Sequence, residues 1–196
     1  MKKRVLALLL CLLTAFSAAA EEEAPLKKRR TESGLFYVKA DHRYFNNAGH
    51  FGVSRIKSGV RLLNAAIDAL EPHIPVSLYL AESSRSHLIE RTFPEDSEVY
   101  RYLLEHLHAD QADHLKYTTY RQFCEYFYAT DHHWNYRGSY QAYADIVYML
   151  FGEDEPYLTP DEKVTLPVKF QGSFAKQERN PVSEELWWMF TVSGSS

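Results

Sequence analysis

The strongest constraint on the fold of this chain is a helical pattern of apolar residues that a short predicted strand follows. Apolar residues recur at helical spacing from Ile56 to Leu70, and Pro72 ends the pattern. Residues 75–80 then form an apolar run that begins with a proline, a position that strands tolerate. Helices that alternate with short buried strands are typical of the α/β class, which we therefore expect.

Three further segments extend this alternation. Residues 35–38 are a short apolar run that predicts a strand, and ordered structure is expected to begin there. A second helix is predicted from Ser97 to Leu107. Residues 110–113 are expected to form a turn, and residues 115–117 another strand.

The clearest helical pattern follows Trp134. Asn135 is a candidate N-cap, and Gly152 stands where a glycine C-cap is expected. Between them, apolar and aromatic residues at i, i+3, i+4, i+7, i+10 and i+11 predict one buried face. This face comprises Tyr140, Tyr143, Ala144, Val147, Leu150 and Phe151.

The N-terminus has the features of a signal peptide. Basic residues 2–4 precede an apolar run over 5–16, and small residues at 18–20 suit cleavage directly after them. The run is too short to span a bilayer, although a retained N-terminal anchor is the alternative. We expect residues 1–20 to be removed and the mature chain to be secreted or held in the cell envelope, without a transmembrane segment.

Loss of residues 1–20 changes the charge and the cysteine content. Lys plus Arg falls from 22 to 19 against 26 acidic residues, so the net charge moves from −4 to −7. This charge argues against nucleic acid as a partner. Cys124 is the cysteine that remains, so no disulfide can form within the mature chain and its core must stabilise the fold.

A charged segment separates the signal peptide from the main domain. Acidic residues 21–23 and basic residues 27–30 predict a solvated, polar linker over 21–34. Electrostatic contact between the basic residues and an envelope polymer is the alternative. One domain is expected over 35–196.

The heptapeptide 128–134, Tyr-Ala-Thr-Asp-His-His-Trp, is the strongest candidate for a functional site. Asp131 and His133 are expected on the loop that enters the helix after Trp134. A spacing of two within a turn lets a carboxylate hold the tautomer and orientation of a histidine that acts as general base. Taken alone, Asp-x-His is common by chance, and a helix cap with a surface histidine pair is the alternative.

The tetrapeptide Asp131-His132-His133-Trp134, with aromatic residues before it and Gly138 after it, resembles the DHHW family of bacterial exported proteins. That family is similar to SGNH hydrolases and to proteins of alginate and cell-wall O-acetylation. The resemblance covers about Leu35 to Ala175. It implies a three-layer α/β/α sandwich with a mostly parallel sheet, in which Asp131 orients the general base His133.

The activity implied by this resemblance is that of a serine esterase or O-acetyltransferase. Its substrates would be O-acylated glycans of the envelope or the extracellular space. A non-catalytic module that binds a glycan or a protein is the alternative. No cofactor is predicted, and no metal site is included in this assignment.

The chain departs from the family at the nucleophile. The relatives carry their serine in a Gly-Asp-Ser turn well downstream of Asp-x-His, and this sequence contains no Gly-Asp-Ser. Ser173, in Gly172-Ser173, is the nearest equivalent, but its position matches a non-catalytic segment. The apolar residues 186–190 also indicate a segment that needs a partner surface to cover it. We therefore expect an incomplete, C-terminally truncated domain that lacks its serine nucleophile, or one that a partner chain completes.

Metal binding is a further hypothesis for the same heptapeptide. Asp131, His132 and His133 are residue types that coordinate divalent metals. The other histidine group, His106, His108 and His114, has the spacing of no standard zinc site.

Tyrosines form a second concentration of candidates. Eight of the 14 tyrosines fall between Tyr117 and Tyr148. Tyr120, Tyr126 or Tyr128 would suit either the core or a stacking platform for a sugar ring, and the core is favoured. The polar segment 82–87, after the strand at 75–80, is another candidate ligand loop.

Overall fold

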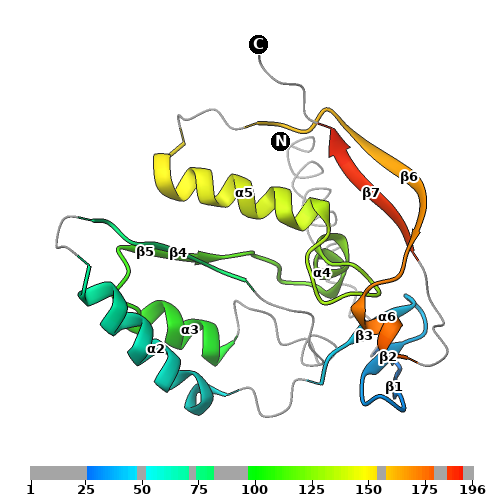
Figure 1. Cartoon of the computed structure of the whole chain (residues 1–196), viewed down its shortest axis with the longest axis horizontal. Helices are drawn as coiled ribbons and strands as arrows, with labels where there is room; N and C mark the ends of the chain where they lie inside the picture. The colour runs from blue at the N-terminus through cyan, green and yellow to red at the C-terminus, as the bar shows by residue number, and fades with distance from the viewer. Residues whose placement is uncertain are drawn as a thin grey trace, which may run out of the picture.

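The structure is a computed structural model, and it combines helices and strands in an α/β fold (Figure 1). The described residues are 26–47, 52–70, 74–81, 97–153, 158–178 and 185–191. The expected signal peptide and the polar segment 82–87 lie outside them. Within these residues, no helix has both the length and the apolar character needed to cross a membrane.

Short strands and longer helices alternate along the chain. In order they are β1 (Lys28–Arg30), β2 (Phe36–Val38), β3 (Arg43–Phe45), α2 (Val53–Asp68), β4 (Ser77–Leu80), α3 (Glu98–His106), β5 (Gln111–His114), α4 (Tyr120–Tyr126), α5 (Tyr136–Phe151), β6 (Glu162–Phe170), α6 (Ser173–Gln177) and β7 (Glu185–Thr191). The predicted strands at 35–38 and 75–80 and the predicted helices at 56–70, 97–107 and after Trp134 are confirmed.

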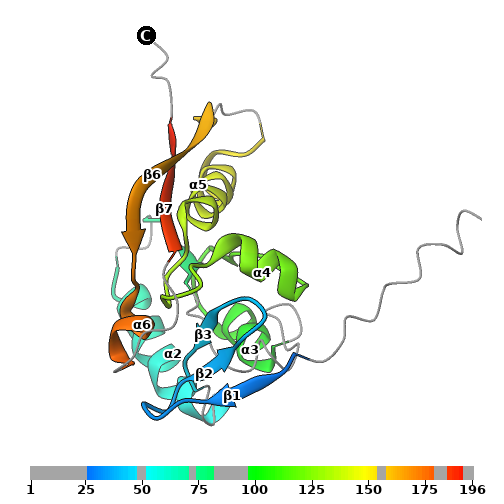
Figure 2. The same ribbon diagram turned by 90° about the vertical axis from the view of Figure 1, so that its right-hand side faces the viewer.

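An antiparallel sheet of β1, β2 and β3 lies at one end of the molecule (Figures 1 and 2). Its edge strand β1 consists of basic residues for which the sequence predicted a polar linker. Lys28 and Arg29 lie over the rings of Phe36 and Tyr37, at 5.2 and 5.1 Å from the ring centroids. Ordered structure therefore begins before residue 35, and its charged edge discourages pairing with another strand.

β4 and β5 form a parallel pair in the middle of the molecule. Asp110 sets their register, because its carboxylate accepts the Val76 N–H (2.7 Å) and its own N–H donates to the Val76 carbonyl (2.9 Å). The strand predicted at 115–117 is wrong, because this pairing places β5 on the polar residues before it. Leu115 and Tyr117 are buried beyond its end.

Helices lie on both sides of this parallel pair. Figure 1 shows α5 on one side and α2 with α3 on the other. Tyr79 of β4 donates a hydrogen bond of 2.6 Å to the Asp145 carboxylate of α5, which fixes this helix over the pair. The apolar segment 186–190, expected to need a partner surface, lies in β7, which pairs antiparallel with β6 and also contacts α5.

The capping predictions for α5 are confirmed. The Asn135 side chain accepts the N–H groups of Arg137 (2.9 Å) and Gly138 (3.1 Å), which are free donors at a helix start. Gly152 ends the helix with φ of +86°, a conformation that favours glycine.

The buried face predicted for α5 is wrong, because none of its six residues is buried and Tyr143, Leu150 and Phe151 are exposed. Leu150 and Phe151 are 51% and 66% exposed, whereas Gly138 and Ala142 are buried. A β-carbon on residue 138 would lie 2.4 Å from the Tyr126 carbonyl oxygen, so the helix meets its neighbours along a line of small residues. Close backbone approach, rather than apolar spacing, orients the first half of α5.

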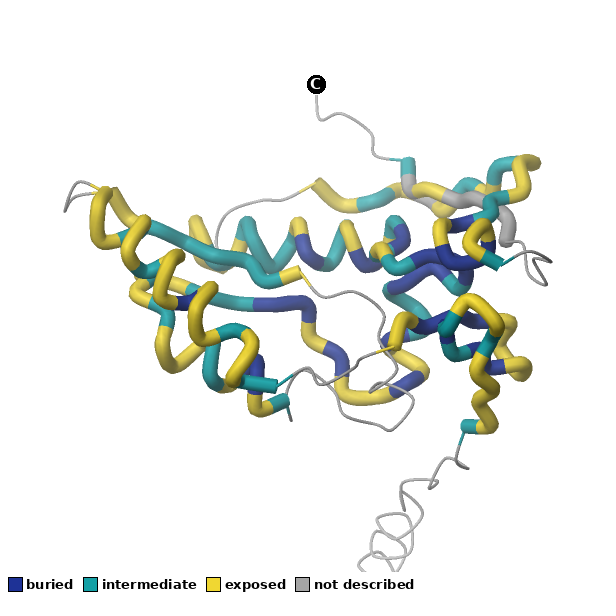
Figure 3. The backbone as a smooth tube through the Cα atoms, turned by 60° about the horizontal axis from the view of Figure 1, so that its bottom comes forward, coloured by how far each residue is buried: buried dark blue, intermediate teal, exposed yellow. Residues whose placement is uncertain are grey.

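An aromatic core joins β3 and α4, and Figure 3 shows the buried segments gathered there. Phe123 stacks on Phe127 at 4.5 Å and on Phe45 at 5.6 Å between ring centroids. Tyr117 and Tyr120 belong to the same cluster. The core therefore supports the end of α4, from which the candidate loop leaves.

Candidate functional site

The candidate heptapeptide lies on the loop that joins α4 to α5. The two ends of the loop are paired, because Phe127 and Trp134 form an antiparallel bridge and the Asn135 N–H donates to the Tyr126 carbonyl at 2.7 Å. The Trp134 ring meets Tyr79 of β4 edge-on, at 6.1 Å between centroids. Trp134 therefore fixes the turn against the sheet.

Arg43 of β3 holds the start of this loop. Its guanidinium, in a residue only 5% exposed, donates to the carbonyls of Cys124 (3.2 Å), Phe127 (3.2 Å) and Tyr128 (2.8 Å). The charge also lies 5.2 Å from the centre of the Phe123 ring, and within the described residues it forms no ion pair. Sequence reasoning missed Arg43, because a single arginine in a short strand has no recognisable pattern.

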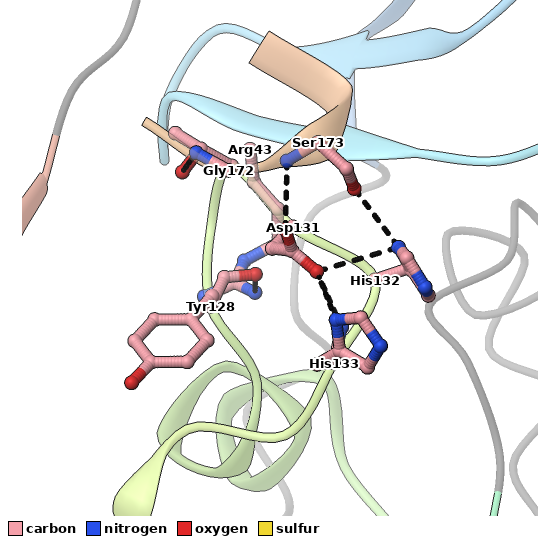
Figure 4. Close-up of polar contacts among 8 residues, drawn as sticks. Arg43, Tyr128, Asp131, His132, His133, Gly172 and Ser173 are labelled. Carbon is pink, nitrogen blue, oxygen red and sulfur yellow. Dashed lines mark hydrogen bonds and ion pairs between the residues drawn. The ribbon is translucent and has the colours of Figure 1, made fainter. Parts of the chain in front are cut away.

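Asp131 and His133 form the central contact of the site (Figure 4). The Asp131 Oδ1 lies 2.5 Å from the His133 Nδ1 and also accepts the His133 N–H at 3.1 Å. Asp131 is 6% exposed, whereas the side chain of His133 is 69% exposed. A carboxylate at Nδ1 places the imidazole proton on that nitrogen and leaves Nε2 as the proton acceptor.

The start of α6 supplies the other oxygen of this carboxylate with a donor. The Ser173 N–H donates to the Asp131 Oδ2 at 2.7 Å, and the Gly172 N–H donates to the Thr130 Oγ1 at 3.0 Å. The Thr130 carbonyl accepts the Phe174 N–H at 3.1 Å. The loop is therefore pinned to α6 by main-chain donors that lie more than 40 residues away in sequence.

These donors keep Asp131 ionised. Burial by itself raises the pKa of Asp131, but the N–H groups of Ser173 and His133 and the His133 ring more than offset it. The pKa of Asp131 is therefore held below its ordinary value. A charged carboxylate is what orients and stabilises a histidine that takes up a proton.

Ser173 contacts His132 rather than His133. Its Oγ lies 2.9 Å from the His132 Nδ1, and the same nitrogen lies 3.3 Å from the Asp131 Oδ1. A catalytic histidine needs one ring nitrogen for the nucleophile and the other for the carboxylate, but here one nitrogen faces both. The geometry therefore does not favour Ser173 as a nucleophile.

A cleft of about 650 Å³ opens beside the two ends of the same loop. Its walls combine cationic, amide and aromatic side chains, among them Arg43, Arg137, Lys163, Gln141, Tyr126 and Tyr140. Of the tyrosines considered as stacking platforms, Tyr126 lines this cleft, whereas Tyr120 and Tyr128 are buried. The cleft can accommodate a ligand with both hydroxyl groups and an apolar face.

Comparisons with protein-family models, with curated proteins and with solved structures find no match. The family resemblance of the sequence therefore rests on the tetrapeptide 131–134 and the residues around it. Within this tetrapeptide, Asp131 and His133 are in direct contact. The geometry of this site and the motif at 131–134 are therefore the grounds on which a function can be proposed.

Proposed function

We propose that this chain is an exported, SGNH-hydrolase-like protein of the DHHW type that acts on acyl esters of envelope or extracellular glycans. Asp131 is the orienting carboxylate, and His133 is the general base. The observation that carries the proposal is the 2.5 Å contact between a buried Asp131 Oδ1 and the Nδ1 of an exposed His133. In the proposed fold, the β4–β5 pair belongs to the sheet of a three-layer α/β/α sandwich.

The proposed chemistry is acyl transfer. The His133 Nε2 accepts the proton of a hydroxyl group as its oxygen attacks the ester carbonyl. Asp131 stabilises the imidazolium that forms, and His133 then returns the proton to the leaving alcohol. Since Ser173 faces His132, the attacking hydroxyl belongs to water or to another serine, including one on a partner chain.

A carbohydrate substrate is supported by the neighbouring cleft. Tyr126 and Tyr140 are aromatic residues of its lining, and Arg137 and Gln141 are lining residues that carry hydrogen-bond donors. Sugars present both an apolar ring face and hydroxyl groups, so this mixture of side chains suits them. Extracytoplasmic location is part of the same proposal, on the grounds of the N-terminal sequence.

Hydrolysis of 4-nitrophenyl acetate and of an O-acetylated glycan by the purified chain tests this function. We expect His133→Ala to reduce turnover by about 10²–10⁴-fold, the range for loss of a general base. Asp131→Asn should also lower it, whereas Ser173→Ala should retain activity. His108→Ala, which removes an exposed histidine paired with Asp68, is the matched control.

The outcomes separate the proposed roles. Equal activity in the parent chain and in His133→Ala would exclude His133 as the base. Loss of activity in Ser173→Ala, with an unchanged fold, would make Ser173 the nucleophile. Absence of ester hydrolysis in the parent chain would reject catalysis by this chain alone.

A binding module is the second candidate function, and the cleft is the observation that favours it. In that case the purified chain binds a glycan without turnover. Tyr126→Ala and Tyr140→Ala would then weaken retention on a glycan affinity column, whereas His133→Ala would not. Weaker retention of His133→Ala, with unchanged retention of the two tyrosine variants, would support the enzyme instead.

A further inference from the structure

We propose that Asp131, His132 and His133 form a binding site for a divalent transition-metal ion such as Zn²⁺. One ligand atom from each residue lies within 4.8 Å of the others, and the Asp131 Oδ1 contacts the Nδ1 atoms of both histidines. Imidazole nitrogen and carboxylate oxygen are ligands that Zn²⁺ favours. Water molecules would occupy the outward-facing coordination positions.

The positions of the three ligand atoms require little movement. Ligand atoms about 2.1 Å from a tetrahedral ion lie roughly 3.4 Å apart, close to the 3.3 Å between the Asp131 Oδ1 and the His132 Nδ1. The 2.5 Å contact to the His133 Nδ1 must widen, and the largely exposed ring of His133 has room to move. Two ligands are thus nearly in place and the third is adjustable.

Asp131 is held in a suitable orientation for this role. Its Oδ2 accepts the Ser173 N–H, so the carboxylate is fixed while Oδ1 faces the two imidazoles. The Ser173 Oγ lies 2.9 Å from the His132 Nδ1, where it would supply an oxygen ligand or a hydrogen bond to a coordinated water. Such fixed surroundings raise the affinity of a metal site.

Another His–Asp pair in the chain lacks this arrangement. The His108 Nδ1 lies 2.8 Å from the Asp68 Oδ1, but both side chains are more than half exposed. Within the described residues, the group at 131–133 is the one in which three ligand atoms converge. His108 with Asp68 is therefore a natural control for weak, non-specific binding of metal to histidine.

Metal binding would exclude the proposed acid–base chemistry. A neutral imidazole that coordinates through Nδ1 carries its proton on Nε2, and Nε2 then cannot accept a proton from a hydroxyl group. The metal takes the place of the Nδ1 proton between His133 and Asp131. This inhibitory consequence rests on the proposed function, whereas the metal site itself does not.

Calorimetric titration of the purified chain with ZnCl₂ tests the site. We expect saturable binding of one ion per chain, weakened at least about tenfold by His132→Ala, by His133→Ala and by Asp131→Asn. His108→Ala should bind as the parent does. Absorption of bound Co²⁺ in the visible range should show a tetrahedral site in the parent and not in His132→Ala. Thermal unfolding of each variant checks that it is folded.

Equal Zn²⁺ affinity in the parent, His132→Ala and His133→Ala would overturn the metal site. So would the absence of saturable binding in the parent. Both readouts are independent of ester hydrolysis, so an inactive chain that binds Zn²⁺ would reject the proposed function and keep the metal site. In an active chain, Zn²⁺ should inhibit the parent more strongly than His132→Ala, and a chelator should restore the rate.

Discussion

Gly172 approaches Thr130 so closely that a β-carbon on residue 172 would lie 2.3 Å from the Thr130 carbonyl oxygen. The same β-carbon would lie 2.5 Å from the Asp131 Cβ. Only glycine permits this approach, which brings the N–H groups of Gly172 and Ser173 to the side chains of Thr130 and Asp131. The geometry of the carboxylate thus depends on a residue without a side chain.

Gly172→Ala is therefore expected to destabilise the fold by about 1–3 kcal/mol, the usual range for overpacking. Denaturant unfolding measures the change. Gly59→Ala in α2 is the control, because nothing lies within 4 Å of its β-carbon position. Alanine is favoured over glycine within a helix by roughly 0.5–1 kcal/mol, so this control should gain stability. A Gly172→Ala protein as stable as the parent would show that the loop and α6 separate at little cost.

Arg43→Met should lower the free energy of unfolding by at least about 2 kcal/mol. It removes a buried charge and three hydrogen bonds to main-chain carbonyl groups, and a buried polar group that is left unsatisfied costs about 1–3 kcal/mol. The control is Arg121→Met, which removes an exposed arginine whose 3.8 Å ion pair with Glu125 is expected to contribute under about 1 kcal/mol. Similar losses in the two variants would contradict the anchoring role of Arg43.

Local sequence patterns predicted the elements whose boundaries depend on nearby residues. The N-cap Asn135 and the C-cap Gly152 delimit α5, because capping involves contacts within a few positions. β5 was misplaced because its register is set by Asp110 and Val76, which lie 34 residues apart. Pairing between distant segments leaves no local pattern in the sequence. Here the pairing with β4 places the largely polar residues Gln111–His114 in a strand.

The same distinction applies to the site. Contact between Asp131 and His133 follows from a spacing of two within a turn, and the structure contains that contact. The Ser173 N–H and the Arg43 guanidinium come from segments far from the loop, and their contributions follow only from the tertiary structure. The contact between Ser173 and His132 could likewise not be predicted from the sequence, because it depends on the direction in which each imidazole points.

Stability should fall in acid through Asp131. The pKa of this carboxyl group is lowered in the folded protein, so its contribution is complete above the unfolded value of about 3.9 and is lost as the pH falls through the folded value. Asp131→Asn should therefore have a flatter profile in this acidic range. Denaturant unfolding at a series of pH values, with a chelator present, measures both proteins.

The control for acid stability is Asp68→Asn, which removes an exposed carboxylate. Its profile should follow that of the parent. If Asp131→Asn did so as well, the hydrogen bonds from Ser173 and His133 would not favour the charged form of Asp131 as the structure indicates.

Cys124 should react slowly with thiol reagents in the folded protein. Burial raises the pKa of its thiol, and the nearby Arg43 opposes this only in part. Because the thiolate is the reactive form, modification by Ellman's reagent near pH 8 should be slower than for an exposed cysteine, whose pKa is about 8.5. Cys11, the other cysteine, lies in the expected signal peptide, so the chain without residues 1–20 has Cys124 as its reporting thiol. The rate of modification of Cys124 should rise with pH and should increase sharply in denaturant. Equal rates in the folded and the denatured protein would show that the thiol is already open to solvent.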